Sequence, residues 1–132
     1  MNDNDQTDFN LIKDVEQKYK VDLRKRLLEF AVAVIRFLMK IQDSTEIRVV
    51  KYQLSKSATS IGANYEEAQS SSRKEFIHKV RIALREANES KYWLKILSEL
   101  SIGDSKKLET LFKESNEISL ILGAIVSKMD RN

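Results

Sequence analysis

Apolar residues recur at helical spacing in four segments of the chain, which short polar breaks separate. The segments cover about residues 23–42, 45–68, 72–100 and 105–128. Positions three and four apart lie on one face of an α-helix, so each segment is predicted to form an amphipathic helix. Short links between long helices favour antiparallel neighbours. The pattern therefore predicts an all-α protein with an antiparallel, up-down-up-down four-helix bundle.

Polar residues punctuate these segments where helices are expected to begin. Asp43 and Ser44 precede the second segment, and Ser72 with Glu75 forms a capping-box pattern at the start of the third. Residues 1–22 are polar, and we expect a partly disordered N-terminal segment that is helical from Phe9 onward. Residues 23–132 are predicted to be the bundle domain. Projection of the helices predicts a core that includes Leu27, Phe30, Val34, Leu54, Ala58, Ile61, Tyr65, Val80, Ala87, Leu94, Leu108, Leu111, Phe112, Ile118 and Leu122.

Two helices carry more apolar positions than one core face needs. Residues 23–42 hold a second apolar stripe, Leu28, Val32, Ile35 and Met39, more than a quarter-turn from the first. One explanation is that this helix is central, or that the N-terminal segment covers it. The explanation we favour is a homo-oligomer, because residues 72–100 show a similar excess. The predicted interface residues are Leu28, Val32, Ile35 and Met39 together with Ile82, Trp93 and Ile96.

The composition narrows the class of protein further. The 132 residues include no proline, three glycines and no cysteine. Without cysteine there is no disulfide and no thiolate site, which fits a reducing compartment. No signal peptide or bilayer-spanning apolar run is evident, so we expect a cytoplasmic protein without membrane contact.

Candidate catalytic or metal-binding groups are sparse. Glu75 and His78 have the Glu-x-x-His spacing of helical di-iron sites, but such sites need two of these motifs and His78 is the single histidine. Adjacent Glu66 and Glu67 point about 100° apart on a helix and do not share a substrate atom easily. No glycine-rich phosphate loop is present. We therefore expect no enzymatic activity, metal, cofactor or small-molecule substrate.

Charge is distributed unevenly along the chain. Residues 1–22 carry a net charge of −3, residues 23–91 carry +6, and the remainder is balanced. Four groups in the middle region, Lys74, His78, Arg81 and Arg85, repeat at helical spacing, and we call this set the basic stripe. Cations in line can follow a phosphate backbone, so the basic stripe is a candidate nucleic-acid contact; an ordinary solvated helix face is the alternative.

A run of small residues surrounds Gly62. Mid-helix glycine costs about 1 kcal/mol relative to alanine, which indicates that a neighbouring side chain needs the space. Asn64 is placed to bond a backbone group on an adjoining helix or subunit, and Tyr65 lies on the core line. We interpret Gly62, Asn64 and Tyr65 as a structural packing motif rather than a ligand site.

Three blocks in this order resemble a known bacterial family. They are Ser60-Ile61-Gly62-Ala63-Asn64-Tyr65-Glu66-Glu67-Ala68, Arg73-Lys74-Glu75-Phe76-Ile77-His78-Lys79 and Glu86-Ala87-Asn88-Glu89-Ser90-Lys91-Tyr92-Trp93-Leu94. Together they resemble four-helix-bundle proteins known as 23S ribosomal RNA intervening-sequence proteins, and more distantly the accessory proteins of diversity-generating retroelements. The family often has arginine where this chain has Lys56 and a basic residue where it has Glu66.

The resemblance implies a four-helix protomer that assembles into a ring, typically a homopentamer, without enzymatic activity. Two functions remain open from the sequence. The first is a non-catalytic oligomeric scaffold that binds RNA, or a nucleic-acid-associated partner, through a basic surface. The second is a purely protein-binding oligomeric adaptor whose charge serves solubility. The arrangement of the basic stripe in the assembly discriminates between them.

Overall fold

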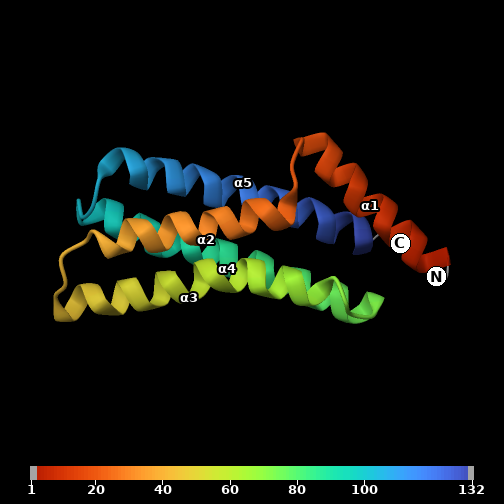
Figure 1. Cartoon of the computed structure of the whole chain (residues 1–132), viewed down its shortest axis with the longest axis horizontal. Coiled ribbons are helices and arrows are strands. Elements are labelled where there is room, and N and C mark those ends of the chain that lie inside the picture. Colours follow the sequence, from red (N-terminus) through yellow and green to blue (C-terminus); the bar gives the residue numbers. More distant parts are fainter. Residues whose placement is uncertain (1–2, 131–132) are drawn as a thin grey trace.

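The computed structural model describes residues 3–130, and the regular secondary structure of this part of the chain is α-helical, with no strand (Figure 1). The predicted all-α class is confirmed. The helices are α1 (Asp3–Tyr19), α2 (Leu23–Met39), α3 (Thr45–Ala68), α4 (Arg73–Glu99) and α5 (Ser105–Asp130). The sequence predicted four long helices after a short N-terminal helical stretch. The structure instead has five helices in the described residues, because the first one already begins at Asp3.

Side chains at the predicted polar breaks cap four of the helices. In each case a side-chain oxygen accepts the backbone N–H three residues ahead, which satisfies a donor that has no partner inside the helix. The acceptor and donor residues are Asp22 and Lys25 (3.4 Å), Ser44 and Ile47 (3.2 Å), Ser72 and Glu75 (3.3 Å), and Asp104 and Lys107 (2.9 Å). Residues 69–72 and 100–104 are therefore short links, and consecutive helices from α2 to α5 run in opposite directions (Figure 1).

The core lies between α2, α3, α4 and α5. α4 packs extensively against both α3 and α5, whereas α2 packs more closely against α3 than against α5. The fully buried large side chains are Tyr65, Leu23, Leu27, Leu54, Ile61, Leu94, Leu97, Ile118, Ile121, Leu122, Ile125 and Met129. Two buried serines lie within this core: the Ser90 hydroxyl donates to the Ser57 hydroxyl at 2.9 Å and so links α4 to α3.

α1 closes one end of the bundle. It packs mainly against α5 and also against α4, and Val15 is only 1% exposed in this contact. The sequence predicted partial disorder for residues 1–22. Apolar residues at helical spacing around Val15, including Leu11, Ile12 and Tyr19, give the segment a face that packs on the core. Residues 1 and 2 lie outside the described residues.

Two predictions of the core were wrong in detail. Phe112 is 39% exposed, because the buried face of α5 runs through Leu111 and Ser115 and leaves Phe112 beside it. Phe37 was not predicted to be buried, yet it is 6% exposed. Its ring lies against Gly103 in the link between α4 and α5, a contact between segments that helical periodicity does not reveal.

Candidate nucleic-acid and oligomer surfaces

The basic stripe lies on the solvent side of α4. Lys74, His78, Arg81 and Arg85 are all exposed. Arg81 is paired with the carboxylate of Asp130 at the end of α5. The pair neutralises one of the four groups, so the structure brings the predicted residues onto one face but leaves that face less positive than the sequence suggested.

Carboxylates beside the basic stripe reduce its charge further. Lys79 on α4 bonds Glu67 of α3 at 2.7 Å, and Glu86 and Glu89 lie on α4 itself. Burial, with a contribution from the neighbouring Glu89 carboxylate, raises the pKa of Glu86 above its usual value. Glu89 accepts a hydrogen bond from the indole nitrogen of Trp93 at 3.2 Å. Within the basic stripe, Arg81 is therefore ion-paired and Arg85 lies close to Glu86, while Lys74 and His78 are exposed.

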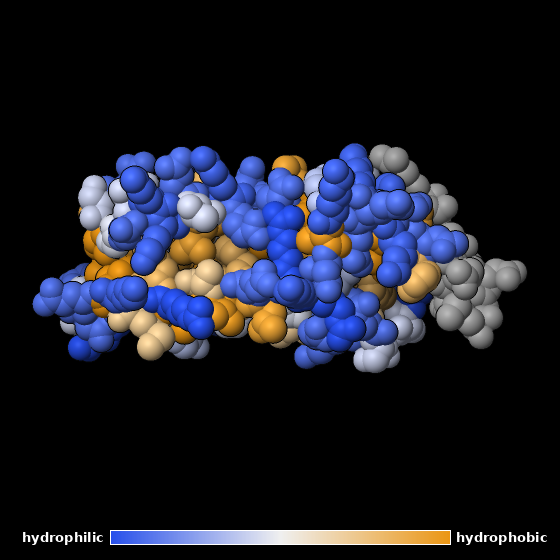
Figure 2. Space-filling view, turned by 45° about the horizontal axis from the view of Figure 1, so that its top comes forward, coloured by the Kyte–Doolittle hydropathy of each residue, from blue (hydrophilic) through white to orange (hydrophobic). Residues whose placement is uncertain are grey.

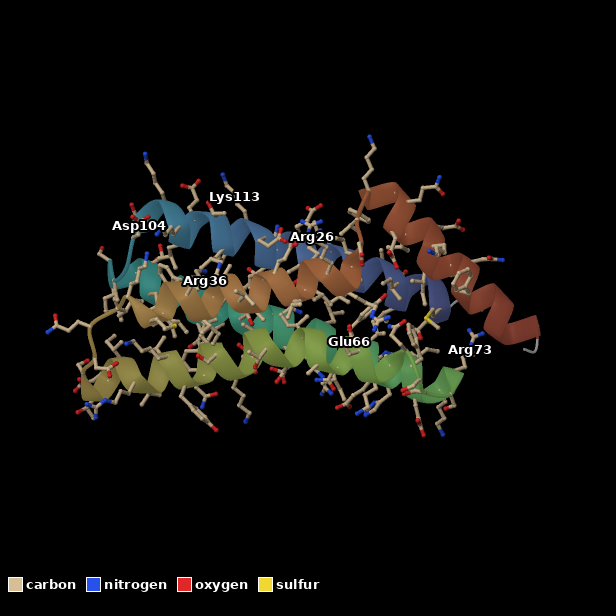
Figure 3. All side chains as sticks on the ribbon, in the orientation of Figure 1. Arg26, Arg36, Glu66, Arg73, Asp104 and Lys113 are labelled. Atoms are coloured by element: carbon tan, nitrogen blue, oxygen red, sulfur yellow. The ribbon has the colours of Figure 1, made fainter. Side chains whose placement is uncertain are left out.

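Glu66, where the resembling family often has a basic residue, neutralises a cation of α2. The carboxylate of Glu66, on α3 (Figure 3), accepts two hydrogen bonds from Arg24, at 2.9 and 2.5 Å. The Arg24 guanidinium holds the pKa of Glu66 below its usual value, and Glu66 raises the pKa of Arg24. Both side chains are about half exposed, so the pair contributes little to stability and mainly lowers the positive charge of this surface.

A second two-bond ion pair joins α2 to α5. The guanidinium of Arg26 donates to both carboxylate oxygens of Glu114, at 2.8 and 2.7 Å (Figure 3). The two side chains are 23% and 30% exposed, which is well below the exposure of the Arg24–Glu66 pair. The bond to Glu114 raises the pKa of Arg26. This pair fixes the spacing of α2 and α5 in the middle of the molecule.

The second apolar stripe is largely open to solvent. Leu28 is 64% exposed, Val32 39% and Met39 77%, and Ile35 is partly buried. α1 does not cover these side chains, and they are not in the core of the protomer. Figure 2, turned so that the top of the Figure 1 view comes forward, shows apolar surface between hydrophilic residues on the face that it presents.

The predicted interface residues of α4 are more buried within the protomer than those of α2. Ile82 is partly buried, and Trp93 and Ile96 pack partly buried against the core. The Trp93 ring also meets Tyr92 edge to face at a centroid distance of 5.4 Å. The structure therefore leaves a stronger unpartnered apolar surface on α2 than on α4.

The motif around Gly62 packs within the protomer. A Cβ atom on Gly62 would lie 3.5 Å from the Cβ of Leu27, an ordinary contact, so α2 does not require glycine at this position. The Asn64 side-chain amide donates to the carbonyl of Ser60 in its own helix at 2.8 Å, not to an adjoining helix. Tyr65 is 1% exposed, and burial raises the pKa of its hydroxyl. Its ring meets Phe76 edge to face.

The structure describes Glu75 and His78 as exposed side chains. Among residues 9–130, whose side chains the structure describes, no group of three or more histidine, aspartate or glutamate side chains is arranged to hold a metal ion. None of the helices described here combines the length and apolar character needed to cross a bilayer.

A pocket between α2 and α5 was missed by sequence reasoning. It has a volume of about 740 Å³, an apolar lining that includes Phe37, Ile41 and Leu111, and several basic side chains. It lies where α2 ends and α5 begins. Neither helix alone has an unusual pattern here, because the pocket arises from the way two helices distant in sequence are placed side by side.

Comparison with known proteins gives two informative matches. The family model described as 23S rRNA-intervening sequence protein matches residues 19–124. A crystal structure of a protein of unknown function, from the S23 ribosomal protein family of Bacteroides thetaiotaomicron, is 39% identical and superposes with a TM-score of 0.70. The match covers 79% of this chain and 97% of that one. A search of curated proteins found no match.

Proposed function

The chain belongs to the 23S rRNA-intervening sequence protein family, and from this premise we propose that it is a non-catalytic scaffold that forms a homo-oligomer and binds RNA. The exposed second apolar stripe carries the oligomeric part of this proposal. The basic stripe supports the RNA-binding part. The proposed scaffold acts inside the cell and uses no metal or cofactor.

The second apolar stripe supports self-association because its exposure is costly in water. Leu28 and Met39 are each more than half exposed, and burying a large apolar side chain contributes about 1.5–3 kcal/mol. A patch of this kind on a small helical protein is typical of an interface. We propose a closed ring in which α2–α5 form the four-helix protomer, with five copies, as the resemblance to the family implies.

Light scattering tests the oligomeric part. We expect the wild-type protein to have a mass several times the 15.3 kDa of one chain. The double variant Val32→Glu/Met39→Glu should fall to the monomer mass, because it places two charges in the proposed interface. The matched control is Val49→Glu/Leu120→Glu, which changes two other exposed apolar residues, 56% and 55% exposed. A monomeric wild-type protein contradicts the proposal.

The basic stripe supports contact with RNA through its unneutralised part. Lys74, His78 and Arg85 are exposed along one face of α4, and Asp130 pairs with Arg81 rather than with any of these three. Each phosphate contact by a cation releases bound counterions, so binding of this kind weakens steeply with salt. It needs no sequence-specific contact, which fits a surface that has cations in line but no arrangement for reading bases.

Titration with labelled structured RNA at low and high salt tests this contact. We expect Lys74→Glu/Arg85→Glu to weaken RNA binding by more than about tenfold. The slope of the logarithm of the binding constant against the logarithm of the salt concentration should become shallower by about one for each lost phosphate contact. The control Lys25→Glu/Lys95→Glu makes the same change in net charge at exposed lysines outside the basic stripe. Equal loss in both double variants would indicate nonspecific attraction rather than a site at the basic stripe.

A protein-binding adaptor is the second candidate, and the ion pairs favour it. Asp130 neutralises Arg81, Glu67 neutralises Lys79, and Glu66 neutralises Arg24, so much of the basic middle region is internally balanced. If the wild-type protein is oligomeric but structured RNA does not bind at low salt, the adaptor function replaces the RNA scaffold.

A further inference from the structure

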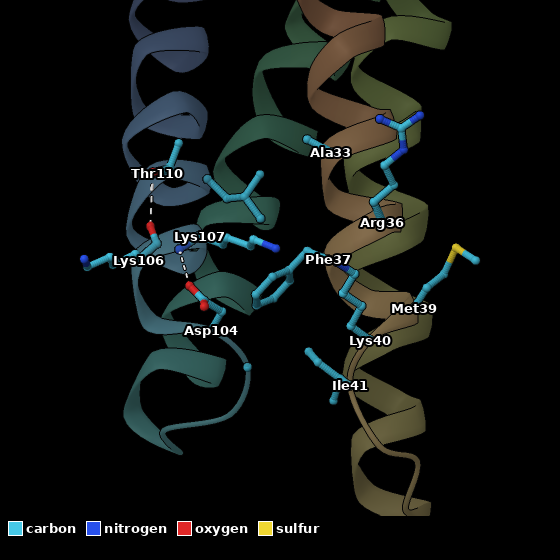
Figure 4. A pocket seen from close by; sticks show the side chains of 12 residues that line it. Ala33, Arg36, Phe37, Met39, Lys40, Ile41, Asp104, Lys106, Lys107 and Thr110 are labelled. Carbon is cyan, nitrogen blue, oxygen red and sulfur yellow. Dashed lines mark hydrogen bonds between the residues drawn. The ribbon is translucent and has the colours of Figure 1, made fainter.

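The α2–α5 pocket combines an apolar floor with cations on opposite walls. Phe37 and Ile41 of the α2 end and Leu111 of α5 form part of the lining. Figure 4 shows the ammonium ends of Lys40, from α2, and Lys107, from α5, reaching toward one another over the Phe37 ring. Two like charges on facing walls repel, and an anion between them relieves that repulsion.

Few negative groups are available in the pocket to balance these cations. Arg36 and Lys106 also line it, although their side chains point away toward its flanks (Figure 4). Asp104 is the one carboxylate among the lining residues that the structure describes. It accepts the backbone N–H of Lys107 at 2.9 Å, so it already caps α5. The pocket therefore has an excess of positive charge over an apolar surface.

The excess of positive charge does not continue further along α2 and α5. A second recess of about 540 Å³ shares Ala33, Thr110 and Leu111 with the first and is lined by Glu29, Glu114 and Glu117. Glu114 is bonded to Arg26, Glu29 is paired with Lys25 at 3.9 Å, and Lys113 also lines the recess, so carboxylates and cations are close to balance there. An extended polyanion lying along the whole groove would meet these carboxylates. The site is thus suited to a short anionic group at one end.

We propose that the α2–α5 pocket binds one nucleotide unit, with its phosphate between Lys40 and Lys107 and its base against the apolar floor. The volume lies within the range of about 300–1,000 Å³ typical of small-ligand sites. A nucleotide matches both features, since it joins a compact anion to a flat aromatic base whose faces can stack on apolar side chains. The unit is either a free nucleotide or an unpaired nucleotide of RNA, and only the second source rests on the proposed function.

An acidic peptide fits these features less well. Its carboxylates would match the two lysines, but the recess lined by Glu29 and Glu117 has no excess of positive charge to attract the continuing chain. Inorganic phosphate alone would leave the apolar floor of the pocket unused. Both groups therefore serve as competitors in the test, because each has only part of the proposed recognition chemistry.

The test is calorimetric titration of the full-length protein with adenosine monophosphate, inorganic phosphate and a short single-stranded oligoadenylate. We expect adenosine monophosphate to bind at least about tenfold more tightly than phosphate. The variant Lys40→Gln/Lys107→Gln should weaken nucleotide binding about tenfold or more. Its matched control is Lys25→Gln/Lys95→Gln, at exposed lysines outside the pocket.

A steric variant tests the floor independently of charge. Ala33→Trp fills the pocket from α2, and Ala63→Trp places the same side chain on exposed α3 surface. We expect only Ala33→Trp to abolish nucleotide binding. Because the lysine variants leave the buried core unchanged, they keep the proposal testable even if Ala33→Trp does not fold. Circular dichroism and light scattering on every variant check that helicity and mass are retained.

The outcomes separate this inference from the proposed function. Oligoadenylate binding much tighter than that of adenosine monophosphate identifies RNA as the source, and equal binding identifies a free nucleotide. No nucleotide binding by the wild-type protein overturns the inference. The inference is also overturned if the pocket variants bind nucleotide as tightly as the wild-type protein, or if polyglutamate or phosphate binds as tightly as adenosine monophosphate. If RNA binding is lost in Lys74→Glu/Arg85→Glu and kept in the pocket variants, RNA is excluded as the source of the nucleotide unit while the proposed function stands.

Discussion

Substitution of Gly103, in the link between α4 and α5, is expected to destabilise the protein more than substitution of the helical glycines Gly62 and Gly123. Gly103 has φ of +88°, a backbone conformation that residues with a side chain rarely adopt. A Cβ atom there would lie 2.5 Å from Cζ and 3.0 Å from Cε2 of the Phe37 ring. Phe37 is 6% exposed, and its ring would have to shift toward the α2–α5 pocket to make room for the new methyl group. Gly103→Ala introduces backbone strain and a steric clash in the same substitution.

The magnitude follows from these two contributions. Left-handed backbone costs an ordinary residue about 1–2 kcal/mol, and overpacking at a buried contact costs about 1–3 kcal/mol. We therefore expect Gly103→Ala to lower the free energy of unfolding by about 2–5 kcal/mol. Total stabilities of domains are only about 5–15 kcal/mol, so the loss is a large fraction of the whole.

Urea denaturation monitored by circular dichroism measures this loss, with Gly123→Ala and Gly62→Ala as internal comparisons. A Cβ atom on Gly123 would have no neighbouring atom within 4 Å, and one on Gly62 would have its nearest neighbour at 3.5 Å. Both glycines lie inside helices, where alanine is favoured by about 1 kcal/mol, so each variant should be slightly stabilised. A Gly103→Ala protein as stable as wild type, or a Gly123→Ala protein that is the more damaged of the two, would refute this account of the link.

Two further predictions concern polar contacts. Ser90→Ala should lower the free energy of unfolding by about 1 kcal/mol, because it removes the hydrogen bond to the buried Ser57 hydroxyl. The double variant Ser57→Ala/Ser90→Ala should recover part of this loss. Urea denaturation measures both variants, and equal losses would contradict the prediction. The hydrogen bonds from Arg24 lower the pKa of Glu66 in the folded state, so their stabilisation is present above the ordinary value of 4.5 and is lost as pH falls through the lower folded value. The stability difference between wild type and Glu66→Gln, measured over a pH series, should therefore shrink in acid, and a difference that grows in acid would contradict the assignment.

Helical periodicity was sufficient to predict the helices and most of the core. Leu54, Ile61 and Val80 lie where the spacing placed them, because one amphipathic face leaves little choice of what is buried. Ser72 was also predicted correctly as a cap, since its bond to Glu75 is local in sequence. These features depend on residues within about one helical turn of each other, and a single sequence contains that information.

Features that depend on contacts between helices were not predictable in the same way. The ion pairs of Arg81 with Asp130 and Arg24 with Glu66 join residues 49 and 42 positions apart, and they change the charge of the surface that the sequence suggested. The same limit explains the pocket, whose walls bring Lys40 and Lys107 together from α2 and α5. The predicted oligomer interface and RNA contact stay predictions, because they concern groups outside the single chain.

The two ends of the bundle differ in what they present. The start of α1 and the end of α5 lie at one end of the molecule, and the end of α2 and the start of α5 lie at the other (Figure 1). Residues from these second segments line the α2–α5 pocket. In a ring whose axis runs along the bundles, every chain end would emerge on one rim and every pocket would open near the opposite rim. The two sides of such a particle would differ. Domains fused to either terminus would crowd one side and leave the other side open to ligands.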